Sequence, residues 1–204
     1  MPRPSNTEER RKQIVLGLLS VMAERGYERA TIQEVARAAG LSPGLVHYHF
    51  HDKQEILLVC VEELAARVRA RVEARIGRAD GARAKVDGFL DAYLATGKDA
   101  DPAAVAAWVT VSAEAVKQKE VRVAYEKVAR EDLGRLEALC AEVVGARRAR
   151  SVAAGLFAAI QGYFVLAAAA PGLTPKGSAA ATAKRMAKGL LDEAASDAET
   201  KEAV

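Results

Sequence analysis

Three helix-start signals follow one another closely between residues 31 and 55, and they constrain the fold more than any other feature of the chain. The run TIQE (31–34) is a capping box, in which the threonine caps the helix and the glutamate reaches back to it. Leu41-Ser42-Pro43 restarts a helix, with serine as cap and proline at the first helical position. Asp52 and Glu55 form a third box. We therefore expect two short helices followed at once by a third, without a flexible linker.

Helical periodicity continues along the rest of the chain. No segment shows the alternation of apolar and polar residues that a half-buried strand requires, and alanine, a strong helix former, is abundant. The chain is therefore expected to be all-α. One long helix is predicted from Lys53 to about Arg78, and further helices are predicted at about 82–97, 103–117, 120–144, 147–170 and 178–195.

The first two short helices match a helix-turn-helix pattern. Ala36 is small enough for the second helix to approach, Gly40 takes the turn conformation, and Val46 packs back onto the first helix. In this motif the second helix enters the major groove of DNA. A plain helical hairpin is the alternative. Against it, the outward face of the second helix offers little aliphatic surface apart from Leu45, since its other residues are Ser42, Gly44, His47, Tyr48 and His49.

All three histidines of the chain, His47, His49 and His51, lie in this stretch. On a strand they would share one face and could bind zinc, but the caps at Ser42 and Asp52 argue against a strand. No further cysteine, histidine or carboxylate is spaced to complete a four-ligand site, so no metal is expected. A cluster that contacts DNA phosphates is favoured, with Phe50 as a core residue that braces the motif.

The remaining sequence indicates neither an enzyme nor a cofactor. It contains no Ser/His/Asp set, no glycine-rich phosphate loop and no metal cluster. Cys60 and Cys140 lie far apart and are interpreted as buried thiols of a reducing compartment, with a redox pair as the alternative. The net charge of +3 does not by itself indicate nucleic-acid binding.

One apolar run, residues 152–170, has a length near that of a membrane-spanning helix. It is rich in alanine, a weak driver of insertion, and we interpret it as a helix of a bundle core or a dimer interface rather than a membrane span. The N-terminal residues are polar and charged and do not resemble a signal peptide. The expected location is cytoplasmic, with no membrane partner.

The run TIQEVARAAGLSPGLVHYHFHDKQEILL (31–58) resembles the signature of the TetR/AcrR family of bacterial transcriptional regulators. The capping threonine, the A-x-x-x-G turn, the S-x-G start of the recognition helix and the aromatic/His run ending in Phe50 carry the resemblance, which covers about residues 7–60. Many members have tyrosine where His47 stands. The resemblance implies DNA contacts by Thr31, Ser42, Pro43, Gly44, Leu45, His47, Tyr48, His49 and Lys53.

Within that implied set, Gly44 and Leu45 would face bases, and Leu45 would make an apolar contact with a thymine methyl group. Phosphates would be bound by Thr31, Tyr48, His49 and Lys53. The basic run Arg10-Arg11-Lys12 has two open interpretations, as further backbone or minor-groove contacts or as a solvated helix start.

Three segments, GLVHYHF, 106–136 and 156–166, are similar to a BetI-like subgroup of this family. That similarity implies about nine helices and a homodimer on double-stranded DNA. It also implies a helix-turn-helix domain over 1–53 and an effector-binding and dimerisation domain over 54–204.

Aromatic and polar residues of the middle helices are the candidates for a pocket that binds a small-molecule effector of unknown identity. They are Phe89, Tyr93, Trp108, Tyr125, Phe157, Gln161 and Phe164. Small residues permit close approach of a second chain, and the dimer candidates are Gly155, Ala159, Gly162, Met186 and Leu190.

The function expected from all of these features is a ligand-responsive repressor. It would bind a palindromic operator as a dimer and leave it when the effector binds. Two alternatives remain open: a DNA-binding protein without an effector, and a thiol-based redox-sensing regulator.

Overall fold

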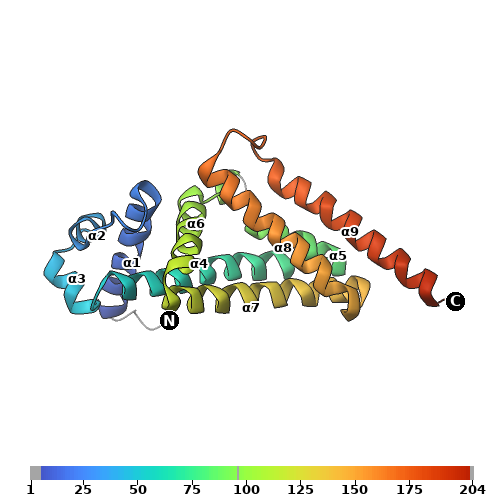
Figure 1. Cartoon of the computed structure of the whole chain (residues 1–204), viewed down its shortest axis with the longest axis horizontal. Helices are drawn as coiled ribbons and strands as arrows, with labels where there is room; N and C mark the ends of the chain where they lie inside the picture. The colour runs from blue at the N-terminus through green and yellow to red at the C-terminus, as the bar shows by residue number, and fades with distance from the viewer. Residues whose placement is uncertain (1–5, 96, 203–204) are drawn as a thin grey trace. The chain divides into compact units, whose positions relative to one another are not determined.

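The computed structural model of the chain describes residues 6–95 and 97–202. Over these residues the chain forms nine α-helices, a short 3-10 helix η1 (Gly97–Asp99) and no strand, which confirms the all-α prediction (Figure 1). The helices are α1 (Asn6–Arg25), α2 (Ile32–Ala39), α3 (Pro43–His49), α4 (Lys53–Ile76), α5 (Ala82–Tyr93), α6 (Pro102–Lys117), α7 (Lys119–Val144), α8 (Ala146–Ala169) and α9 (Ser178–Glu202).

The chain divides into two compact units. The first unit comprises Met1–Ala65 and Pro102–Val128, and so contains α1 to α3, the start of α4, α6 and the start of α7. The second unit comprises Ala66–Asp101 and Ala129–Val204, and contains the remainder of α4 and α7 together with α5, α8 and α9. The functional division at residue 53 stays a prediction.

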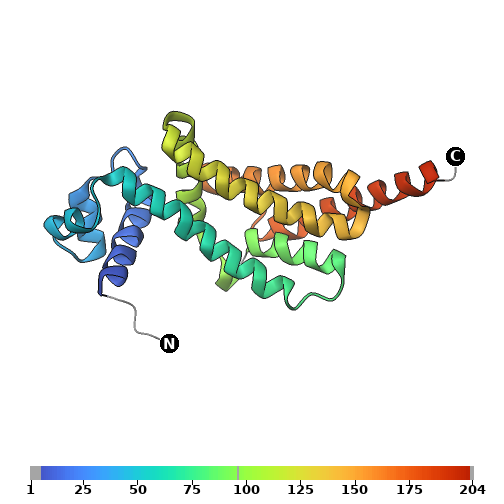
Figure 2. The same cartoon turned by 90° about the horizontal axis from the view of Figure 1, so that it is seen from below.

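The core of the first unit forms around α1, which packs against α2 and α6. Ile14, Leu18 and Met22 recur at helical spacing on α1 and are at most 2% exposed. The side of α1 that faces α2 carries Gly17, where an added Cβ would lie 2.8 Å from the carbonyl oxygen of Val35. Only glycine permits this approach, which brings α1, α2 and α3 together (blue to cyan in Figure 2).

The turn between α2 and α3 has the geometry that its sequence predicts. The Thr31 Oγ1 accepts the N–H of Glu34 at 3.2 Å, and the Glu34 carboxylate accepts the N–H of Thr31 at 3.0 Å, which closes the capping box. Gly40 ends α2 in the left-handed region, with φ 68°. Val46 of α3 is fully buried.

The third capping arrangement differs from the prediction by one residue. Asp52 caps α4 as expected, because its Oδ1 accepts the N–H of Glu55 at 2.8 Å. The Glu55 carboxylate, however, accepts the N–H of His51 at 2.7 Å rather than that of Asp52. Glu55 therefore stabilises the turn that ends α3 as well as the start of α4.

In the second unit α9 packs against both α5 and α8 (Figure 1). Phe89, Leu90, Leu156 and Ile160 are fully buried and supply much of its apolar core. Two ion pairs join α5 to α9: Arg83 to Asp192 at 2.8 Å and Lys184 to Asp91 at 3.1 Å. Because solvent reaches the side chains of both pairs, each pair is expected to contribute little to stability.

Two predicted helix ends were wrong. Helix α5 ends at Tyr93 and not near residue 97, because Leu94 turns out of the helix and buries its side chain, which is 5% exposed. Helix α9 continues past residue 195 to Glu202. Among the helices of the described residues, α8 is long and apolar enough by length and composition to cross a membrane, and 28% of its most apolar stretch is buried within the chain.

Candidate nucleic-acid interface and effector site

The start of α3 presents a small, polar surface. The Ser42 Oγ accepts the N–H of Leu45 at 3.2 Å and so caps the helix, and Pro43 occupies the first helical position. Ser42, Pro43 and Gly44 are exposed, whereas Leu45 is half-buried. A Cβ at Gly44 would meet nothing within 4 Å. The glycine is therefore not required by the chain's own packing, and it leaves the helix backbone open to an outside partner.

The end of α3 carries the aromatic and imidazole side chains. Tyr48 is 79% exposed, and its ring contacts that of His49 edge-on, with ring centres 5.1 Å apart. His47 is exposed and His49 is half-buried. Phe50 is 2% exposed, which confirms its predicted place in the core.

Two predicted phosphate contacts are already engaged within the chain. The Lys53 Nζ donates to the carbonyl oxygen of Tyr27 at 2.8 Å and lies 4.2 Å from the centre of the Tyr27 ring. Partial burial lowers the pKa of Lys53. Thr31 is exposed, but its hydroxyl donates to the Glu34 carboxylate at 3.1 Å. Either residue would have to share or release its intramolecular bond to contact a phosphate.

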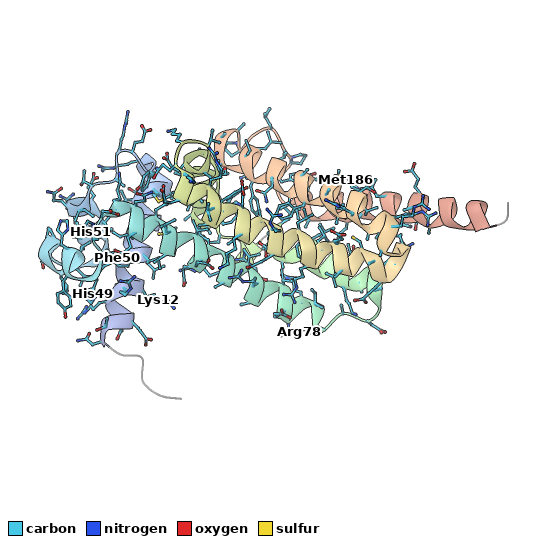
Figure 3. The ribbon with its side chains drawn as sticks, turned by 60° about the horizontal axis from the view of Figure 1, so that its bottom comes forward. Lys12, His49, Phe50, His51, Arg78 and Met186 are labelled. Carbon is cyan, nitrogen blue, oxygen red and sulfur yellow. The ribbon has the colours of Figure 1, made fainter. Side chains whose placement is uncertain are left out.

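Arg11 of α1 contacts the end of α3, the residue that follows it and the start of α4, and no local sequence signal indicates these contacts. One guanidinium nitrogen donates to the carbonyl oxygen of His49. The guanidinium lies 4.0 Å from the centre of the Phe50 ring, and its other nitrogen lies 3.4 Å from the Glu55 carboxylate. Figure 3 shows His49, Phe50 and His51 beside α1, on which Lys12 is exposed.

A buried charge in the first unit was also not predicted from the sequence. Glu114 of α6 is 5% exposed and accepts hydrogen bonds from Gln118 at 2.7 Å and from Lys117 at 3.4 Å. Lys117 also bonds to Glu28 at 2.7 Å, and so ties α6 to the segment that follows α1. Burial, with Glu114 and Asp52 nearby, raises the pKa of Tyr27 to about 12. Charged residues near a helix end are common, so the sequence alone does not distinguish Glu114, Lys117 and Glu28 from solvated charges. The fold distinguishes them because it brings them together.

Five of the seven effector candidates belong to the second unit. Phe89 stacks on Tyr93 with ring centres 4.7 Å apart, and Phe157 and Phe164 each lie 6.4 Å from the Tyr93 ring. Gln161 lies on α8 between these two phenylalanines, at helical spacing from both. The rings pack directly on one another, so a ligand would have to separate them to enter.

A buried acid accompanies this aromatic cluster. Asp132 of α7 is 5% exposed, and its burial raises the pKa of its carboxyl group. The Tyr93 hydroxyl is buried without a hydrogen-bond partner of ordinary geometry, although Asp132 is close enough that burial and that carboxylate both raise the pKa of Tyr93. Asp132 falls between Val128 and Leu136 on the apolar stripe of α7, and that position is the signal by which the sequence could have revealed it.

The other two effector candidates, Trp108 and Tyr125, form a separate pair in the first unit, with ring centres 5.3 Å apart. Trp108 is 9% exposed and Tyr125 is half-buried. This pair is consistent with ordinary core packing.

The predicted dimer residues lie on surfaces of α8 and α9 that this single chain leaves uncovered. Gly155, Gly162 and Met186 are exposed, and Ala159 and Leu190 are half-buried. A Cβ at Gly155 or Gly162 would meet nothing within 4 Å. The small size of both glycines is therefore not explained by packing within one chain.

Neither cysteine has the surroundings of a reactive thiol. Cys60 and Cys140 are both fully buried. The Cys60 Sγ lies 3.6 Å from the carbonyl oxygen of Val15. Burial raises the pKa of Cys140 to about 11, which suppresses the thiolate. Within the part of the chain that the structure describes, no group of three or more His, Cys, Asp or Glu side chains could hold a metal ion.

Comparison with known proteins places this arrangement in a family. The profile of "Bacterial regulatory proteins, tetR family" matches residues 14–60, and that of "BetI-type transcriptional repressor, C-terminal" matches residues 82–192. The chain belongs to the tetR family of bacterial transcriptional regulators. This tetR-family chain is 32% identical over 169 residues to the HTH-type transcriptional regulator BetI of Rhizobium meliloti (strain 1021), and the match covers 81% of each protein.

Solved structures share the fold of this tetR-family chain. A transcriptional regulator from Rhodococcus sp. Rha1 superposes with a TM-score of 0.80 at 24% identity, over 91% of this chain and 97% of that one. A transcriptional regulator from Saccharomonospora viridis, solved in complex with choline, gives a TM-score of 0.72 at 22% identity, over 91% and 95% of the two chains. The family confirms a helix-turn-helix regulator of transcription with a BetI-type C-terminal region.

Proposed function

We propose that this regulator is a repressor that binds a palindromic operator as a homodimer and releases it when a small-molecule effector binds the second unit. The observation that carries the DNA-binding half of the proposal is the exposed face of α3. Its tyrosine is 79% exposed, and its glycine is open to an outside partner. The groups that face outward are those that suit phosphate oxygens and base edges.

The effector site is assigned to the aromatic cluster around Tyr93 together with Asp132. Four aromatic rings and a buried carboxyl group make a site for an organic cation, because ring faces and a carboxylate both attract positive charge. The choline complex of the Saccharomonospora viridis regulator supports the choice of a quaternary ammonium compound. A cation beside Asp132 would favour its ionised form, so binding would change the charge within the cluster.

The dimer is assigned to α8 and α9. Gly155 and Gly162 leave space that nothing in the chain fills, and Met186 is 43% exposed. A second copy related by a two-fold axis would cover this apolar face and would present two α3 helices to a palindromic site. An intracellular, cytoplasmic location follows from this role, and α8 then serves as an interface helix rather than a membrane span.

DNA binding is tested with the duplex that the full-length protein enriches from a pool of random sequence. Replacing Leu45 by alanine should relax the base preference at one position of each half-site by about 1–3 kcal/mol, whereas Tyr48→Ala should weaken binding to all sequences alike. If Leu45→Ala retains the full preference of the wild type, α3 is not the reading helix.

Effector binding is tested with choline, betaine and a neutral isostere of choline, 3,3-dimethylbutan-1-ol. The quaternary amines should raise the melting temperature and release the enriched duplex, and the neutral alcohol should do neither. Asp132→Asn should lose the response to choline while still binding DNA. A chain that binds DNA but ignores every compound would support the alternative of a DNA-binding protein without an effector. The redox-sensor alternative has less support, because both thiols are buried.

A further inference from the structure

We propose that Arg11 is a positioning residue for the recognition helix: it holds the C-terminal end of α3 in the orientation that reads DNA, and it does not itself contact DNA. The inference goes beyond the proposed function, but it rests on the assignment of α3 as the reading helix. From sequence, the basic run Arg10-Arg11-Lys12 has two open interpretations, as backbone or minor-groove contacts and as a solvated helix start, and neither distinguishes Arg11 from its neighbours.

The need for such a residue follows from the length of α3. The helix has seven residues, so most of its carbonyl groups lie in the last turn and have no partner within the helix. The residue that follows, Phe50, is in extended backbone with φ −141°, and no glycine is present to close a left-handed C-terminal cap. The Arg11 guanidinium supplies the missing donor, because it donates to the carbonyl oxygen of His49.

The other two contacts of Arg11 fix its direction. Its guanidinium lies over the Phe50 ring at 4.0 Å, and Phe50 is 2% exposed, so the cation rests on a ring that cannot move without opening the core. The Glu55 carboxylate lies 3.4 Å from the other terminal nitrogen of the guanidinium group. The same carboxylate accepts the N–H of His51 at 2.7 Å. Arg11 and Glu55 together therefore hold the backbone on both sides of Phe50.

The neighbouring basic residues are placed differently. Lys12 is exposed. Arg10 donates to Gln13 of its own helix at 2.9 Å. Of the three side chains, Arg11 is the one that bonds to a backbone carbonyl of α3. The helix-turn-helix motif thus joins α1 to α3 through a charge-assisted bond between residues 38 positions apart.

The test compares Arg11→Gln and Arg11→Lys with Lys12→Gln, which removes the same charge one residue away. Dissociation constants are measured for the enriched duplex and for a scrambled duplex of equal length over a range of salt concentrations. Arg11→Gln should lower the ratio of specific to non-specific affinity by about tenfold or more, because a hydrogen bond to a charged group is lost. The salt slope for the scrambled duplex should change by much less than one. Lys12→Gln should keep the ratio.

Arg11→Lys separates positioning from simple loss of stability. It keeps a cation over Phe50 but cannot bond to His49 and Glu55 at once, so its ratio should fall between those of the wild type and Arg11→Gln. Amide hydrogen exchange at His51 should be faster in Arg11→Gln and in Glu55→Gln, and unchanged in Lys12→Gln. The effects of Arg11→Gln and Glu55→Gln should not add in the double variant. If Arg11→Gln does not fold, Arg11→Lys and Glu55→Gln carry the test.

Two results would overturn the inference. If Arg11→Gln weakens both duplexes equally and lowers the salt slope by about two, which is about one for each chain of the dimer, Arg11 contacts a phosphate. If it binds both duplexes like the wild type, Arg11 has no role in reading. Leu45→Ala distinguishes this failure from a failure of the proposed function. Unchanged base preference in that variant removes α3 as the reader and both proposals with it, whereas relaxed preference beside a neutral Arg11→Gln removes the Arg11 inference alone.

Discussion

The ammonium group of Lys53 donates to the carbonyl oxygen of Tyr27 at 2.8 Å and rests over the ring of the same residue at 4.2 Å. One lysine at the start of α4 thereby holds the segment that joins α1 to α2. The family resemblance assigned this lysine to a DNA phosphate, and the intramolecular bond offers a different use for the same charge.

The salt dependence of DNA binding distinguishes these two uses of Lys53. If the ammonium group leaves Tyr27 for a phosphate, Lys53→Met should lower the slope of log affinity against log salt by about two, because the proposed dimer carries two copies of Lys53 and releases about one counterion fewer at each. If it remains with Tyr27, the slope should stay unchanged and the melting temperature of the free protein should fall. Binding titrations at several salt concentrations, with a thermal melt of each variant, measure both quantities. We expect the reduced slope.

Because α1 and α2 approach closely at Gly17, one methyl group added there should lower the stability of the fold. In Gly17→Ala the new Cβ would meet the carbonyl oxygen of Val35 at 2.8 Å and the backbone nitrogen of Ala39 at 3.1 Å. The two helices would have to separate, and we expect a loss of about 1–3 kcal/mol in the free energy of unfolding by urea.

The matched control for Gly17 is Gly134 of α7, where a Cβ would meet nothing within 4 Å. Gly134→Ala should stabilise the protein by about 0.5–1 kcal/mol, since alanine is the better helix former. Equal effects of the two substitutions would show that α1 and α2 are not held as closely as described.

The buried carboxyl group of Asp132 predicts a pH dependence of stability. Burial raises its pKa, the nearby Glu131 raises it further, and Tyr93, Arg69 and Arg135 oppose the rise. The folded state holds the proton of Asp132 more tightly than the unfolded state does. Ionising Asp132 therefore lowers the free energy of unfolding, and this loss is absent below the ordinary pKa of an aspartic acid. It develops as the pH rises from there toward the raised pKa.

Asp132→Asn removes this loss of stability. Its melting temperature should exceed that of the wild type at about pH 8, and the difference should shrink toward zero at about pH 4. Thermal melts across this range in the absence of ligand measure the effect. A constant difference at every pH would mean that Asp132 titrates as it would in the unfolded chain.

The uncovered face of α8 predicts how a bulky side chain at Gly162 would affect the proposed dimer. Gly162→Leu should leave the helical content unchanged, because a Cβ at this position meets nothing in the chain, but it should weaken or abolish the dimer. Gly134→Leu places the same side chain on α7 and should leave the dimer intact. Sedimentation velocity at several protein concentrations measures the mass. A wild-type chain that remains monomeric throughout would remove the dimer from the proposal.

The parts of the structure that were predictable from sequence are those that depend on local signals. The Thr31 capping box, the Gly40 turn and the Ser42 cap each involve residues within five positions of one another, so the chain specifies them wherever it is placed. The same reasoning placed the hydrogen-bond partner of the Glu55 carboxylate one residue too late, at Asp52 instead of His51. A carboxylate that reaches back can accept from either of two adjacent N–H groups.

The parts that were not predictable depend on distant partners. The partners of Arg11 lie 38 and 44 positions away, and without them the residue looks like a solvated charge at a helix start. Asp132 and Tyr93 belong to different helices. The aromatic candidates were recognisable by residue type, but only the fold separates the Trp108 pair from the cluster around Tyr93.

If the proposed homodimer and repressor role hold, the uncovered face of α8 also has a genetic consequence. A subunit whose α3 is damaged but whose α8 is intact would still pair with a healthy copy, and the mixed pair would carry one working reading head instead of two. Expressed beside the wild-type allele, such a variant would sequester wild-type subunits in mixed dimers and derepress the target genes. Damage to α8 itself would be recessive, because a subunit that cannot pair cannot interfere.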